Sequence, residues 1–302
     1  FLPGLVSYED NPPLLVLELL RQAKPLWQQF RAGEERAFLL RVSHALGSAL
    51  GTIHHTFQNP ALVQGPHLGW LPRQVPGALE IHKPGPEVLA TLSSANWQTL
   101  HILQTHEHLS ERLDGLRRLW QPETVIHNDL RADNVFVLPG LGGTTGPVEI
   151  RILDWEFVQF GDPAWDVAGV LQDFIHGWIH SMDLTGSLDF EALEKSAYCS
   201  RQELQEAIRL FWQGYRTVAE RRAAETERLL DRAVAFSAAR LIQTAYELGQ
   251  FLNTIARESV LLLQVGANIL GNPEAAQVHL YGIPQEFTSG HSTCSSRPVG
   301  DN

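Results

Sequence analysis

The sequence predicts an α+β fold that is mostly helical and contains a few short β-strands. Apolar residues recur at helical spacing over 37–57 and over most of the chain after Asp166. Strand-like runs stand near the N-terminus and between residues 124 and 153, where 148–153 alternates apolar with polar side chains. The 302-residue chain is 44% hydrophobic and 19% charged, which is typical of a folded protein with an ample core.

The overall charge restricts the partners that we expect. A formal net charge of −11 disfavours general binding to nucleic acid or anionic membranes, because both depend on clustered Lys and Arg. Two cysteines, Cys199 and Cys294, are too few for a disulfide framework and fit a reducing compartment. No secretory signal is visible in the first residues given, and the most apolar window, 260–270, is too short to cross a bilayer of ~30 Å. We expect a cytoplasmic protein with no nucleic-acid or membrane partner.

The N-terminal part predicts two strands and one long helix. The strand-like runs 2–8 and 14–20 are separated by a turn cluster at 9–13. The amphipathic helix over 37–57 carries His54 and His55 near its end. Metal binding is one interpretation of this pair, but at the end of an apolar helix hydrogen-bonded structural histidines are the commoner case, and we expect those.

The middle of the chain predicts a loop-rich excursion, helices and then a set of short strands. Residues 58–86 are rich in Pro and Gly, and 87–120 predicts two helical pieces. Strands follow at 124–126, 134–138 and 148–153. The Gly-rich segment 139–147 lacks the Lys-Ser/Thr ending of a phosphate-binding loop, and no helix follows it, so it predicts a hairpin tip.

The C-terminal part predicts helices and a flexible tail. Ser200 and Glu203 form a capping box that opens a helix to about residue 220, and helices are predicted over 222–252 and 258–270. Residues 286–302 are rich in Ser, Thr and Gly and predict a flexible tail.

Two further histidines, His176 and His180, lie four residues apart on a predicted helix. This spacing occurs in zinc sites, but neither a His-Glu-x-x-His motif nor a third ligand accompanies the pair in the sequence. We therefore expect no metal there.

One motif carries chemistry. His127-Asn128-Asp129-Leu130 lies between apolar runs, Asn134 follows five residues after Asp129, and Asp154 ends a later strand. Kinases use this order: the first Asp orients the substrate hydroxyl, while the Asn and the later Asp ligate Mg²⁺. A hairpin loop with turn-forming Asp and Asn is the alternative. The two elements, in this order and at this spacing, favour phosphoryl transfer.

These residues, with Leu153-Asp154-Trp155-Glu156 and the segment 161–168, resemble the aminoglycoside phosphotransferase and choline kinase-like superfamily. The resemblance implies a protein-kinase-like fold, Asp129 as catalytic residue, and Asn134 and Asp154 as magnesium ligands. It also implies that His127 and Asp166 support the site, and that Asp166 begins the next helix and caps its amide groups. Asn128 stands where Gly is common, which is tolerable because Asn also adopts left-handed backbone.

The same resemblance divides the chain into parts. Residues 1–20 would be a remnant of the N-lobe strands with a nucleotide hinge at Glu18, Leu19 and Leu20, and 21–285 would be a helical C-lobe. The three lysines, Lys24, Lys83 and Lys195, all follow the hinge, so the strand Lys that binds phosphates is not visible. The N-lobe is therefore expected to be truncated, reduced or completed by another polypeptide.

The function that we expect is ATP-dependent phosphorylation of a hydroxyl, with ATP and Mg²⁺ as cofactors. Segments 238–247, 261–274 and 279–284 resemble kinases of class V lanthipeptide and thioamitide pathways, which phosphorylate Ser or Thr of a precursor peptide before a separate lyase eliminates the phosphate. A small-molecule kinase (for an aminoglycoside, amino alcohol or sugar) and an inactive kinase-fold scaffold remain alternatives.

A peptide substrate would need an extended groove. The candidate anchors are the aromatic residues Trp178, Trp212 and Tyr215, with Asp173 and Glu206 as candidate carboxylates. The alternative, that these aromatics are core, suits Trp212 and Tyr215 better than Trp178.

Overall fold

The structure is a computed structural model that describes residues 1–11, 13–31, 36–63, 65, 68–106, 108–138, 148–186, 189–219 and 221–285. The predicted hairpin tip at 139–147 and the predicted tail at 286–302 lie outside the described residues.

Two helices that are far apart in the sequence form the closest contact of the fold. Helix α2 (Arg36–Thr56) packs along α9 (Arg201–Val218), and both confirm the predicted amphipathic helices. A Cβ added at Gly47 would lie 1.9 Å from the carbonyl oxygen of Phe211, and one at Gly214 would lie 2.2 Å from that of His44. The two backbones meet here, so only glycine fits at either position. The capping box of Ser200 and Glu203 opens α9, as predicted.

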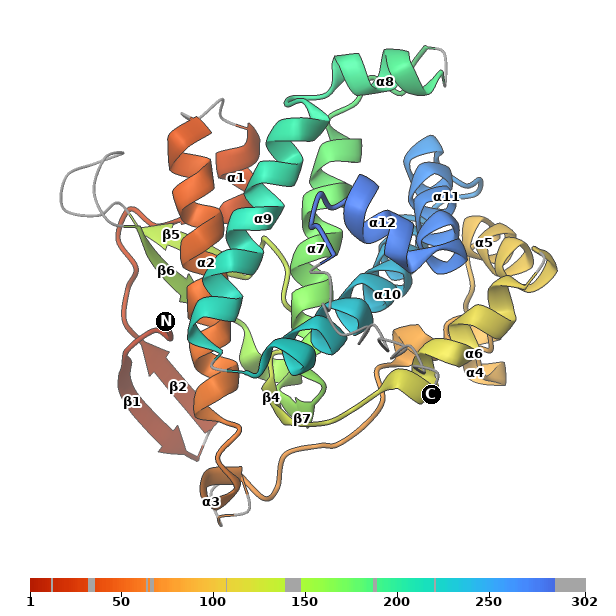
Figure 1. The fold of residues 1–302 in the computed structure, drawn as a ribbon. Coiled ribbons are helices and arrows are strands. Elements are labelled where there is room, and N and C mark those ends of the chain that lie inside the picture. Colours follow the sequence, from red (N-terminus) through yellow and green to blue (C-terminus); the bar gives the residue numbers. More distant parts are fainter. Residues whose placement is uncertain are drawn as a thin grey trace, which may run out of the picture.

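The other long helices complete the core (Figure 1). Helix α10 (Ala223–Leu248) crosses against α7 (Pro163–His180) and α11 (Arg257–Gly271), and the short α12 (Pro273–His279) packs on α10. Trp165 of α7 and Phe236 of α10 meet in an edge contact, with ring centroids 5.8 Å apart, and both are fully buried. The helices predicted over 222–252 and 258–270 are thereby confirmed.

Short antiparallel strands position the two motif loops, residues 127–134 and 153–156, which carry Asp129, Asn134 and Asp154. Strand β4 (Thr124–Ile126) pairs with β7 (Gln159–Gly161), and β5 (Val135–Leu138) pairs with β6 (Glu149–Ile152) and with β3 (Lys24–Pro25). The three predicted strands are confirmed. Strands β3 and β7 were not predicted, because two or three residues are too few to show a period of two.

The N-terminal residues form a separate hairpin. Strands β1 (Leu5–Asp10) and β2 (Pro13–Leu17) confirm the two predicted strands; they pair antiparallel and lie at one edge of the molecule in Figure 1. The amide of Ile152 donates to the carbonyl of Phe1 (2.9 Å), and the Arg151 guanidinium lies 3.5 Å from the Glu18 carboxylate. These contacts hold the start of the chain against β6, next to the motif loops.

Two further helices and several short elements complete the described chain. Helices α5 (Ser94–Thr105) and α6 (Leu109–Leu119) confirm the two predicted pieces. The short elements are α1 (Leu26–Arg31), α3 (Pro60–Val63), η1 (Gly77–Glu80), α4 (Pro86–Leu89), η3 (Trp155–Phe157) and α8 (Phe190–Ser196). Among the described residues, no helix is long and apolar enough to cross a membrane.

The aromatic residues proposed as groove anchors belong to the core. Trp178, Trp212 and Tyr215 are 2%, 6% and 0% exposed. Trp178 donates its indole N–H to the carbonyl of Cys199 (3.0 Å), and Trp212 stacks on Tyr215 with centroids 5.5 Å apart. The groove interpretation is therefore wrong for all three, because Trp178 of α7 and both aromatic residues of α9 pack into the interior.

Candidate active site

The loop between β4 and β5 closes on itself through hydrogen bonds. Asn128 has a left-handed backbone (φ 70°), as its residue type predicts. The amide of Asp129 donates to Nδ1 of His127 (3.3 Å), and Nδ2 of Asn134 donates to the backbone carbonyl of Asp129 (3.0 Å). The amide group of Asn134 is thereby fixed, which leaves its carbonyl oxygen as a potential ligand.

The second motif lies at the same end of the β5–β6 pair. The amide of Leu153 donates to the carbonyl of Asn134 (2.9 Å), which extends the ladder by one residue and brings Asn134 next to Asp154. Nε2 of His127 bonds to the carbonyl of Leu153 (2.7 Å) and ties the two loops together. Asp154 has a left-handed backbone (φ 63°) and an exposed side chain, and no group in the described part of the chain pairs with its carboxylate.

The carboxylate of Asp166 holds the loop between β4 and β5 through two hydrogen bonds. Its Oδ2 accepts from the amide of His127 (2.7 Å), and its Oδ1 accepts from the amide of Asn128 (2.9 Å). The side chain is 1% exposed. Burial acts to raise the pKa of Asp166, but the hydrogen bond and charge of His54 and the neighbouring His127 hold that pKa below its usual value. The supporting geometry expected for Asp166 is present.

One detail of that expectation is wrong: Asp166 does not begin the helix. Helix α7 starts at Pro163, and Asp162 is its N-cap, accepting from the amide of Ala164 (2.9 Å). Proline suits the first helical position because its missing N–H would have no partner there. Asp166 therefore lies within the first turn, and its carboxylate faces the loop instead of the helix amides.

Two buried hydrogen bonds connect Asp166 to His54 of α2 and, through His54, to Tyr215 of α9. Nε2 of His54 lies 3.2 Å from Oδ2 of Asp166, and Nδ1 of His54 lies 3.0 Å from the hydroxyl of Tyr215. A carboxylate only accepts, so Nε2 donates, and in neutral His54 Nδ1 then accepts from the tyrosine. The structural role predicted for His54 is confirmed, whereas His55 is exposed.

A second buried network was not predicted. Asp162 is fully buried, and Arg232 of α10 bonds both of its oxygens, at 2.9 and 3.1 Å. Burial raises the pKa of Asp162, although Arg232 opposes the shift. Arg232 also reaches Glu123 (3.1 Å), just before β4, and Arg221 bonds the same carboxylate (2.6 Å). The Asp162-Pro163 pair is a helix-start signal that could have located the cap, but its arginine partner comes from a distant helix.

Two arginines face Asp129, and neither was predicted. The guanidinium of Arg240, from α10, lies 3.6 Å from Oδ1 of Asp129, and that of Arg131 lies 3.8 Å from the same oxygen. Arg240 is 4% exposed and packs over the ring of Trp165. Within the described chain, the buried Nε atoms of both arginines have no hydrogen-bond partner. The site thus concentrates positive charge next to its carboxylates.

Asp173 of α7 differs from the other acidic residues of the site in the size of its pKa shift. It accepts from the amide of Ala132, next to Arg131 in the loop. Burial, partly offset by that hydrogen bond and by nearby cationic groups, raises the pKa of Asp173 to about 6.

The raised pKa predicts a specific pH dependence of stability. An ordinary Asp has a pKa of ~3.9, so between about pH 4 and 6 the folded state binds more protons than the unfolded state, and stability falls as the pH rises through that range. We expect Asp173→Asn to be more stable than the wild type at pH 7, by up to ~3 kcal/mol, with the difference shrinking towards pH 4. Urea unfolding at both pH values measures it. A difference that does not change with pH would contradict the assignment.

The residues of the predicted hinge, 18–20, follow β2 and belong to neither a helix nor a strand. Glu18 donates its amide to the carbonyl of Gly4 (2.8 Å), and the side chain of Leu19 is largely exposed. The role of Glu18, Leu19 and Leu20 as a nucleotide hinge stays a prediction.

Comparison with known proteins identifies the family. The sequence profile of the phosphotransferase enzyme family matches residues 22–189, which is more than half of the chain. The chain belongs to this family. The match contains both motif loops and α7, so the predicted membership of the aminoglycoside phosphotransferase and choline kinase-like superfamily is confirmed, and with it the kinase-like α+β fold.

Other comparisons add less. No curated protein matches the sequence. A solved structure of an ethanolamine kinase from Plasmodium vivax is similar, with a TM-score of 0.45 and 13% identity, over 84% of this chain and 64% of that chain. The chain therefore spans less than two thirds of the length of that kinase.

Proposed function

We propose that the protein transfers a phosphoryl group from ATP to a hydroxyl. The observation that supports this best is the convergence of Asp129, Asn134 and Asp154 at one end of the β5–β6 pair, on loops joined by the His127–Leu153 hydrogen bond. Phosphoryl transfer needs positioned charge more than covalent chemistry, so a rigid loop that carries these groups is what the reaction requires.

The donor atoms suit magnesium. The amide oxygen of Asn134 and the carboxylate of Asp154, which pairs with no group among the described residues, are hard oxygen ligands of the kind that Mg²⁺ prefers, and Mg²⁺ would neutralise the triphosphate charge. Asp129 would accept a hydrogen bond from the acceptor hydroxyl and aim its oxygen at the phosphorus. Asp166 would hold the loop amides of His127 and Asn128 while this happens.

The two arginines would act on the phosphate side. Arg131 and Arg240 lie within 4 Å of Oδ1 of Asp129, and in the described chain their Nε–H groups donate no hydrogen bond. Negative charge develops on the transferred oxygens, and a cation already fixed nearby stabilises it without reorganisation. Glu247 holds Arg131 through a bond of 2.9 Å.

For the acceptor, we propose Ser or Thr of a precursor peptide, whose phosphate a separate lyase then eliminates. The support is the resemblance of 238–247, 261–274 and 279–284 to peptide kinases of lanthipeptide-type pathways. The first of these segments supplies Arg240 and Glu247 to the catalytic loop, so part of the resemblance lies at the site itself and not only in helix packing.

The test supplies the full chain with Mg²⁺-ATP and three separate acceptors: a precursor peptide, an aminoglycoside and an amino alcohol. We expect mass spectrometry to find phosphorylated Ser or Thr, and dehydrated residues when the lyase is co-expressed. Efficient phosphorylation of a small alcohol with an unmodified peptide would replace the peptide proposal. Transfer to no acceptor, with no ATP turnover, would favour the inactive scaffold.

A further inference from the structure

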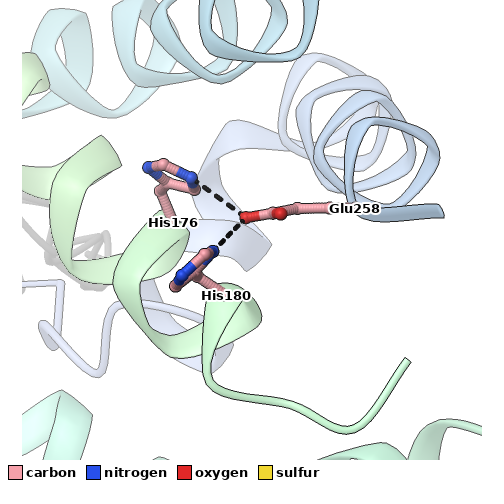
Figure 2. A group of neighbouring side chains, drawn as sticks. All are labelled: His176, His180 and Glu258. Atoms are coloured by element: carbon pink, nitrogen blue, oxygen red, sulfur yellow. Dashed lines mark hydrogen bonds and ion pairs between the residues drawn. The ribbon is translucent and has the colours of Figure 1, made fainter. Parts of the chain in front are cut away.

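A second group of metal-binding side chains lies away from the motif loops. His176 and His180 lie one turn apart on the same face of α7, and Glu258 lies in the first turn of α11 (Figure 2). Oε1 of Glu258 is 3.2 Å from Nε2 of His176 and 2.9 Å from Nδ1 of His180. All three potential ligand atoms lie within 4.8 Å of one another. The structure thus provides the third ligand that the sequence near the histidine pair lacks.

We propose that His176, His180 and Glu258 bind a zinc ion, with water in the fourth position. Two imidazole nitrogens and one carboxylate oxygen form a donor set that zinc takes in proteins. Tetrahedral zinc with bonds of ~2.0–2.1 Å separates its ligand atoms by roughly 3.3 Å. The observed His–Glu separations, 3.2 and 2.9 Å, are already close to that value. Nitrogen donors also make the site a poor one for Mg²⁺, so it differs in kind from the Asn134–Asp154 pair.

The surroundings leave room for a cation. The side chains of His176, His180 and Glu258 are 27%, 46% and 19% exposed, so an ion can enter from solvent while the ligands stay positioned by their helices. Arg257 is the neighbouring cation, but its guanidinium donates to the carbonyls of Leu184 (2.7 Å) and Gly186 (3.0 Å). The positive charge of Arg257, which precedes Glu258 in the sequence, is therefore held by carbonyl groups of the loop after α7.

The position of the site indicates what the ion would do. His176 lies ten residues after Asp166 on α7, which corresponds to ~15 Å along the helix axis. The ion would therefore not touch the proposed phosphoryl-transfer groups. It would fasten α7, which carries Asp166 and Asp173, to α11, and both of these helices also pack on α10.

The experiment measures zinc binding by the full chain after removal of metals. We expect calorimetry to find one equivalent of Zn²⁺, Co²⁺ to give the absorption spectrum of a tetrahedral site, and the melting temperature to rise on the order of 5 °C at about a hundredfold excess of zinc over Kd. Excess Mg²⁺ should not displace the ion.

Variants test the ligands one by one. His180→Ala alters the most exposed ligand, so it should leave the fold intact and weaken zinc binding by ~100-fold or more, and Glu258→Gln should do the same. His101→Ala, an exposed histidine on α5, is the matched control and should bind like the wild type. Absence of zinc binding, or binding that persists unchanged in His180→Ala and Glu258→Gln, would overturn the proposal.

Discussion

Replacement of Asp129 by Asn should lower turnover by ~1,000-fold or more while leaving the protein folded. A positioned general base contributes ~10²–10⁴ to the rate, and an amide cannot take the proton of the acceptor hydroxyl. The side chain is 23% exposed, and its charged neighbours, Arg240 and Arg131, are at 3.6 and 3.8 Å, so its loss removes no close hydrogen bond. Phosphate transfer under saturating Mg²⁺-ATP and thermal melting measure the two effects.

Asp133 supplies a matched control on the same loop. It is exposed, lies four residues after Asp129, and in the described chain it contributes only long-range charge to Arg131. Asp133→Asn makes the same chemical change and should keep most of the turnover. If Asp129→Asn keeps turnover near the wild-type value, or if both variants lose it equally, the catalytic role of Asp129 is wrong.

Replacement of Asp166 by Ala should cost ~3–5 kcal/mol of folding free energy and also ~100-fold in rate. The change leaves the amides of His127 and Asn128, and the ring of His54, without their buried acceptor. A loss of this size should lower the melting temperature on the order of 10 °C. The loop that carries Asp129 would then be displaced, and small displacements of catalytic groups have effects of that order on rate.

The pH dependence gives a second measurement for Asp166. Its folded pKa is below the unfolded value, so its contribution to stability is present above the unfolded pKa and is lost as the pH falls through the folded one. We expect the wild type to lose its advantage over Asp166→Ala in acid.

Asp189→Ala is the control for a lost acceptor. Asp189 caps the exposed helix α8 through the amide of Ala192, so its loss should cost ~1 kcal/mol and leave the rate unchanged. A variant Asp166→Ala that melts like the wild type but has no activity would instead place the carboxylate in contact with the metal or substrate.

The local elements could be predicted because their signals are local. The helix α2, the capping box at Ser200, and the strands β4, β5 and β6 follow from periodicity and capping chemistry within a few residues. The order of the Asp129, Asn134 and Asp154 motifs also lies within one stretch of chain. It indicated the family that the profile match confirms.

Position within the helix and side-chain orientation were less predictable. Asp166 was expected to begin α7 because the carboxylate follows a turn, whereas the preceding Asp162-Pro163 pair makes the better start. Trp178 was expected at a surface because aromatic residues anchor peptides, whereas the packing of α7 turns it inwards. In both cases the local sequence allowed more than one arrangement, and the packing of α7 against its neighbours decided which one forms.

By itself, the sequence determined the long helices, the strands β1, β2, β4, β5 and β6, the family and the residues of the two motif loops. Only the tertiary structure decided which distant groups meet them: Arg240 at Asp129, His54 and Tyr215 behind Asp166, and Glu258 between His176 and His180. These contacts join residues about 80 to 160 positions apart, and no periodicity or spacing encodes them. They arise because helices pack by burying their apolar faces, and that packing fixes which polar side chains at the margins come within bonding distance.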